Sequence, residues 1–88
     1  MANPVMHQAD HDFWKAYDAL PQATRDQADK AFALLKQNPK HPSLHFKKIG
    51  RRWSVRVNSK CRALALEIDD GFLWYWIGPH DAYERMIR

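Results

Sequence analysis

The sequence predicts an α+β fold in which an N-terminal αα-hairpin packs on a four-stranded antiparallel sheet and a short helix ends the chain. Three observations predict it. Apolar residues recur at helical spacing over about residues 11–37, the period changes to two from residue 45, and the later segments are joined by very short connections. Connections this short join antiparallel neighbours. At 88 residues the chain is long enough for one domain, residues 1–88, and too short for two.

The first two elements should be helices at about 11–19 and 22–37. Four residues form the apolar stripe of the first: Phe13, Trp14, Tyr17 and Leu20. Asp10 is well placed as its N-cap. Pro21 interrupts the ladder and is tolerated in the first turn of the second helix, which Asn38-Pro39 ends. With almost no loop between them, the helices should form an antiparallel hairpin whose apolar stripes face a common partner.

Four short strands are expected after the helices, at about 44–49, 53–58, 61–68 and 72–77. Asp70-Gly71 is the strongest hairpin signal in the chain. The last run, FLWYWI, is apolar on both faces, which predicts a central strand or one covered on both sides. Residues 78–87 should form a loop and a short helix with Asp81 as a possible N-cap.

The turn at 58–60 leaves two strand registers open. With a three-residue turn Arg56 stands opposite Arg62, whereas a two-residue turn gives a better apolar core and pairs Arg52 with Glu67. Two arginines facing each other destabilise a sheet unless an anion lies between them. Stability alone therefore favours the second register, a phosphate site favours the first, and a β-bulge could reconcile them.

Positive charge is concentrated in the second half of the chain. The formal net charge is +4 at pH 7. Eight bases occur between residues 40 and 62 with no acid among them: Lys40, Lys47, Lys48, Arg51, Arg52, Arg56, Lys60 and Arg62. A one-sided field of this kind attracts phosphate or an acidic protein segment. The alternative is a solvated basic surface that only keeps the protein soluble.

Several classes of site and location are excluded by pattern. Cys61 is the only cysteine, so no internal disulfide can form, and its apolar surroundings favour a buried thiol in a reducing cytoplasm. No secretory signal is recognisable and no apolar run approaches the roughly 20 residues that span a bilayer. Zinc signatures, Gly-rich phosphate loops and nucleophile elbows are missing from the sequence, so we expect no metal and no cofactor. The remaining cations, histidine and tyrosines suit metal-free phosphodiester chemistry or binding alone.

Three motifs in order, NP-x-HPSL-x-FKKI, W-S-V-R-V-x₄-R-A-L and FLWYWIG-x-H-x-x-Y-E, give the chain a family resemblance. Over about residues 11–88 it resembles the RelE/ParE superfamily of bacterial type II toxins, especially the plasmid-stabilisation branch. The resemblance implies a helical hairpin on one face of an antiparallel sheet. It also implies metal-independent mRNA cleavage, usually on the ribosome, for RelE-like members, and poisoning of DNA gyrase for ParE-like members. Both kinds are neutralised by an antitoxin that wraps around the toxin.

The resemblance also implies site residues. The strand arginines and the C-terminal polar pair of nuclease members match the candidate catalytic residues: Arg56, Arg62, His80 and Tyr83. The family's basic pair, with the adjacent arginines, gives the candidate phosphate-binding residues: Lys47, Lys48, Arg51 and Arg52. Two departures stand against the match. The usual opening strand is barely present in NPVMHQ, and Cys61 occupies a position where many relatives carry tyrosine.

The leading expectation is a toxin that cleaves mRNA by activating a ribose 2′-hydroxyl to attack the adjacent phosphate. The arginines would stabilise the phosphorane and His80 would exchange a proton. Glu67 and Glu84 are possible bases, although nothing in the sequence places either near the arginines. The alternatives are a ParE-like gyrase inhibitor and a non-catalytic basic interaction domain. In the simplest alternative, His80 is an exposed loop residue and Tyr83 only packs the last helix on the sheet.

Overall fold

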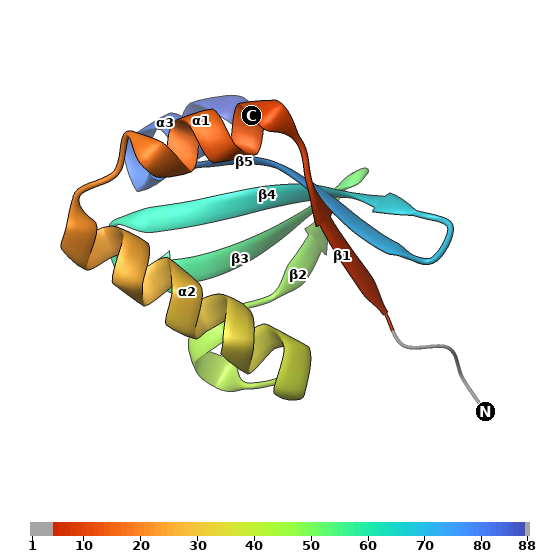
Figure 1. Cartoon of the computed structure of the whole chain (residues 1–88). Coiled ribbons are helices and arrows are strands. Elements are labelled where there is room, and N and C mark those ends of the chain that lie inside the picture. Colours follow the sequence, from red (N-terminus) through yellow and green to blue (C-terminus); the bar gives the residue numbers. More distant parts are fainter. Residues whose placement is uncertain (1–4, 88) are drawn as a thin grey trace.

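The computed structural model describes residues 5–87 and shows a five-stranded mixed sheet with helices on both faces (Figure 1). The elements follow in the order β1 Met6–Ala9, α1 His11–Asp18, α2 Gln22–Gln37, a 3₁₀ turn Pro42–Leu44, β2 Lys47–Ile49, β3 Arg52–Asn58, β4 Cys61–Ile68, β5 Gly71–Pro79 and α3 His80–Ile87. The strand order is β1-β5-β4-β3-β2. The α+β class is therefore confirmed, and β5 is a central strand as its apolar sequence predicts.

The predicted four-stranded antiparallel sheet is wrong by one strand. β1 pairs in parallel with β5 at the sheet edge, with Met6 opposite Gly71 and Ala9 opposite Trp74. A Cβ on Gly71 would lie 1.8 Å from the Met6 carbonyl oxygen, so only glycine lets β1 approach this closely. The strand is four residues long and takes its register from β5, which explains why its own sequence carries so little strand signal.

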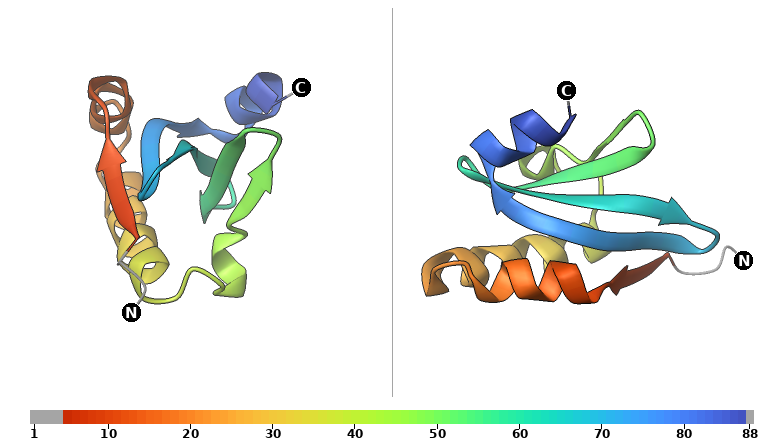
Figure 2. Two further views of the ribbon diagram at one scale, coloured as in Figure 1. Left: turned by 90° about the vertical axis from the view of Figure 1, so that its right-hand side faces the viewer. Right: turned by 90° about the horizontal axis from the view of Figure 1, so that it is seen from above.

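The two N-terminal helices lie where the sequence predicts them. Asp10 caps α1, since its Oδ1 accepts from the Phe13 N–H at 2.9 Å. Pro21 precedes α2 as its N-cap residue instead of lying in its first turn. Figure 2 shows both helices on one face of the sheet and α3 on the other. The hairpin detail differs from the prediction, because α1 packs mainly on β5 and α2 on β3, with their apolar stripes facing the sheet.

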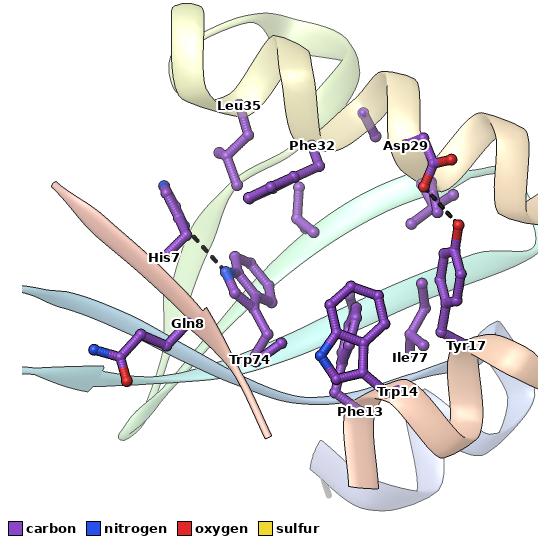
Figure 3. A pocket seen from close by; sticks show the side chains of 16 residues that line it. His7, Gln8, Phe13, Trp14, Tyr17, Asp29, Phe32, Leu35, Trp74 and Ile77 are labelled. Atoms are coloured by element: carbon purple, nitrogen blue, oxygen red, sulfur yellow. Dashed lines mark hydrogen bonds between the residues drawn. The ribbon is translucent and has the colours of Figure 1, made fainter. Parts of the chain in front are cut away.

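An apolar pocket of about 170 Å³ lies between α1, α2 and the sheet (Figure 3). Trp14 and Phe32 line it and are 50% and 40% exposed. At the β1 end, His7 stacks on Phe72 and Trp74 with ring centroids 5.7 and 6.2 Å apart. The Trp74 Nε1–H donates to His7 Nδ1 at 3.1 Å. This bond requires His7 to be neutral, because a protonated Nδ1 could not accept it.

The free energy of unfolding should fall as the pH drops below 6.5 because of His7. Burial, with a smaller contribution from Lys36, lowers the pKa of His7 from 6.5. The unfolded chain therefore binds a proton that the folded chain excludes, and stability is lost between 6.5 and the lowered pKa. Urea unfolding at a series of pH values measures this slope. The control His7→Gln keeps an acceptor for Trp74 without titrating, so an unchanged slope in that variant would contradict the assignment.

The C-terminal helix begins without the predicted loop. β5 continues to Pro79 and α3 starts at His80, whose N–H donates to the Lys60 carbonyl oxygen at 2.8 Å. Asp81 consequently lies in the first turn of α3 and is not its N-cap. This bond ties the start of α3 to the β3–β4 turn. It thereby brings His80 to the same end of the sheet as the strand arginines.

Candidate active site

The β3–β4 register combines the two possibilities that the sequence leaves open. Asn58 pairs with Cys61 across a two-residue turn, yet Arg56 pairs with Arg62, because a β-bulge at Val57 shifts the register between them. The two arginines thus stand directly opposite each other on adjacent strands. The alternative pairing of Arg52 with Glu67 is wrong, since Arg52 lies opposite Leu66.

A second pocket of about 170 Å³ lies on the α3 face of the sheet, between β2, β3, β4 and α3. It contains five of the eight candidate residues: Lys47, Arg56, Arg62, His80 and Tyr83. Strand alternation explains the grouping. Lys47 pairs with Ser54, and Ser54 and Arg56, two residues apart, point to the same face. The pocket therefore gathers three cationic side chains and two histidines, His80 and His45, at one place.

The other three candidates lie outside this pocket. Lys48 pairs with Trp53, whose side chain packs against the core on the α1–α2 face, so alternation sends Lys48 away from the arginines. Arg51 is exposed in the turn after Gly50. The guanidinium of Arg52 donates to the Met86 carbonyl oxygen near the end of α3. Arg52 therefore has a structural contact of its own, which fastens the last turn of α3 to the sheet.

Arg62 is held in place by backbone carbonyls. One of its terminal nitrogens, Nη1, donates to the carbonyl oxygens of Asn58 at 2.5 Å and Cys61 at 3.1 Å. Burial, and after it the positive charge of Arg56, lowers the pKa of the Arg62 guanidinium. Both effects disfavour a cation at this position. An anion bound between the two arginines would offset the repulsion between them.

The neighbouring Cys61 is buried as predicted, and burial raises the pKa of its thiol.

Tyr83 forms the floor of the pocket. Its side chain is 5% exposed, and its hydroxyl donates to the Oγ of Ser54 at 3.2 Å. Ser54 is itself 2% exposed and is the one buried polar residue of the part of the chain that the structure describes. This contact fixes α3 against β3. Ser54 is not among the site residues predicted from the sequence, although its alternation with Arg56 along β3 places it on the site face.

His80 and Glu84 form a pair at the rim of the pocket. The distance from His80 Nε2 to Glu84 Oε1 is 3.1 Å, and the side chains are 36% and 46% exposed. The His80 and Tyr83 rings lie 5.6 Å apart. Because α3 starts at His80, Glu84 follows four residues later on the same face of the helix. The sequence predicts this pair only if the start of the helix is known. Glu67 lies elsewhere and accepts from Trp53 Nε1.

The pocket offers several cationic donors to an anion, and His80 adds an imidazole at its rim. Within residues 5–87, no three His, Cys, Asp or Glu side chains are grouped so that they could hold a metal ion. None of the helices described is long and apolar enough to cross a membrane. Two guanidinium groups from opposite strand positions suit a phosphate, whose oxygens accept hydrogen bonds from planar forked donors.

No protein-family model matches the sequence, and no curated protein matches it. Solved structures do match the fold. Free E. coli toxin RelE, in a mutant form, gives a TM-score of 0.67 at 16% identity over 93% of this chain and 90% of that chain. A chain of the RelB-RelE antitoxin-toxin complex from Methanococcus jannaschii gives 0.70 at 12% identity over 92% and 99%. YafQ from E. coli gives 0.68 at 13% identity over 90% and 97%. The protein therefore has the fold of the RelE toxin, as the sequence resemblance predicts.

Proposed function

We propose that this protein is the toxin of a type II toxin-antitoxin system and that it cleaves mRNA without a metal ion. The observation that carries the proposal is the cross-strand pair of Arg56 and Arg62, which lies in one pocket with Lys47 and His80. A like-charged pair of this kind costs stability unless an anion occupies it. The RelE fold and the motif resemblance support the same reading and point to the RNA backbone as that anion.

The arginines are proposed to hold the scissile phosphate. As the 2′-oxygen attacks, charge increases on the non-bridging phosphate oxygens, and the two guanidinium groups stabilise that charge more than they stabilise the ground state. The carbonyls of Asn58 and Cys61 hold Arg62 in place beforehand. Lys47 binds the backbone beside the reacting phosphate as a point charge. Lys48, Arg51 and Arg52 would contribute only to the wider positive field.

His80 is proposed to move the proton. A neutral imidazole has a lone pair on one nitrogen, so it can accept the 2′-hydroxyl proton as the oxygen attacks phosphorus. The bond from phosphorus to the 5′-oxygen then breaks, and that oxygen takes a proton from solvent. The products are a 2′,3′-cyclic phosphate and a free 5′-hydroxyl. Tyr83, three residues further along α3, supports this geometry by fixing the helix to Ser54.

The proposed partners are an antitoxin and mRNA on the ribosome, which places the protein in the cytoplasm. Solved structures with this fold include an intact E. coli RelBE toxin-antitoxin complex. An antitoxin segment with acidic residues would match the charge of the pocket. A small acidic protein encoded beside this gene would support the assignment. Membership of the plasmid-stabilisation branch belongs to the same proposal.

A translating extract tests the activity. Purified protein added to the extract should shorten the messages. The shortening should persist when a metal chelator is added up to the concentration that translation tolerates. Co-purified antitoxin should prevent the cleavage. Messages that stay intact under active translation would contradict the proposal. If the protein then inhibited supercoiling by gyrase, the ParE-like alternative would replace it. If neither assay showed an effect, the remaining interpretation would be a non-catalytic basic interaction domain.

A further inference from the structure

The carboxylate of Glu84 is an unexpected group in a pocket that is otherwise positive. It lines the same pocket as Lys47, Arg56 and Arg62, and its charge favours the charged form of Arg62, yet its close contact is with Nε2 of His80 at 3.1 Å. A negative charge at this place repels an RNA backbone. RNA binding therefore does not explain why Glu84 lies in this pocket. Its position beside the imidazole indicates a role in the chemistry of His80.

We propose that Glu84 is a positioning residue that sets which nitrogen of His80 carries the proton. This inference rests on the proposed function. A carboxylate accepts hydrogen bonds and does not donate them, so Nε2 of a neutral His80 must hold the hydrogen that points at Glu84. The lone pair then lies on Nδ1, which becomes the nitrogen that takes the proton from the 2′-hydroxyl. The one-turn spacing on α3 keeps the ring in that orientation.

Two other roles predict different behaviour. If Glu84 were itself the base, its charge would be essential and an amide could not replace it. If the His80–Glu84 pair only stabilised α3, as exposed pairs four residues apart do weakly, its loss would slightly lower the free energy of unfolding. The rate of cleavage would then be unchanged. In the positioning role the acceptor oxygen matters more than the charge. Its loss should matter only while His80 is present.

Nitrogen NMR of the imidazole reads the tautomer directly in the protein without RNA. In ¹⁵N-labelled wild-type protein at a pH where His80 is neutral, Nε2 should show the shift of a protonated nitrogen and Nδ1 that of a bare one. His80→Ala assigns the signals among the five histidines. In Glu84→Ala the two shifts should move toward each other as both tautomers become populated. Unchanged shifts in Glu84→Ala would overturn the inference even if cleavage were confirmed.

Cleavage kinetics give the second test. Glu84→Ala should lower the maximal rate by about 10- to 100-fold, the loss that follows when a group orienting a metal-binding histidine is removed. RNA should bind it as tightly as the wild type or more tightly. Glu84→Gln, which keeps an acceptor oxygen, should retain most of the activity that Glu84→Ala loses. The matched control Asp81→Ala removes the same charge from α3 at an exposed position outside the pocket and should cleave normally.

A double-mutant cycle separates the outcomes. His80→Ala combined with Glu84→Ala should be no slower than His80→Ala alone, because Glu84 acts only through His80. A further loss in the double variant, or equal inactivity of Glu84→Gln and Glu84→Ala, would overturn the positioning role in favour of a direct base. Absence of cleavage by the wild-type protein would contradict the proposed function, while the NMR result would still decide the tautomer.

Discussion

Replacing Arg56 by alanine should lower the rate of RNA cleavage by about 100- to 1000-fold without destabilising the protein. The loss is the usual cost of removing one donor that stabilises transition-state charge. No hydrogen bond of the Arg56 side chain occurs among the described residues, and its charge repels Arg62 across the strands. Removing it should therefore leave the melting temperature unchanged or raise it, since cross-strand pairs contribute about 0.2–1 kcal/mol each. Single-turnover cleavage and thermal unfolding measure the two effects.

The matched control is Arg85→Ala, which removes an exposed arginine from α3 outside the pocket. It changes the net charge by the same amount, so any general weakening of RNA attraction should be equal in the two variants. Cleavage by Arg56→Ala at the rate of Arg85→Ala would mean that the basic strands serve only as a docking surface. A large loss of stability in Arg56→Ala would show that the arginine pair is structural.

His80→Ala should reduce cleavage by about 100- to 10,000-fold, the range that general acid–base catalysis contributes. RNA binding should be retained, because His80 is proposed to move a proton and the cations bind the backbone. Single-turnover rates at saturating RNA provide the measurement.

His11→Ala is the control for His80→Ala, since His11 is exposed at the start of α1 on the opposite face of the sheet. It should behave as the wild type. Toxicity that survives in His80→Ala, together with inhibition of gyrase supercoiling, would favour binding over cleavage. That outcome would support the ParE-like alternative.

Local patterns in the sequence predicted the helices and three of the strands well. The α2 boundaries and those of β4 are confirmed at both ends, because apolar period and proline or turn residues mark them strongly. β1 was missed as a fifth strand because a four-residue parallel edge strand is specified by its partner. Gly71, which lets the Met6 backbone approach β5, is the residue that specifies it.

From the sequence alone, the pairing of Arg56 with Arg62 is one of two possible strand registers. Stability arguments favour the register that separates the two charges, and the β-bulge at Val57 restores their pairing while keeping a two-residue turn. A bulge has no residue pattern strong enough to be predicted from one sequence. The bulge matters because it places two like charges opposite each other, an arrangement that stability alone does not select.

The residues that contact His80 and Tyr83 could not be predicted from the sequence alone. The sequence predicts a loop before the last helix, whereas α3 starts at His80, and that start places Glu84 beside its ring. Tyr83 had two interpretations, catalytic or packing, and the bond to Ser54 gives it a buried structural contact inside the pocket. Pairings across 29 residues, as between Ser54 and Tyr83, leave no local trace in the sequence.

The chemistry of new RNA ends tests the central claim most directly. Cells expressing the wild-type protein or Arg56→Ala without antitoxin would be compared by mapping the ends of their messages. We expect internal fragments with 5′-hydroxyl and 2′,3′-cyclic phosphate ends in the wild type and their absence in Arg56→Ala at equal protein level. Growth arrest by the wild-type protein with intact messages, or the same fragments in both strains, would contradict it.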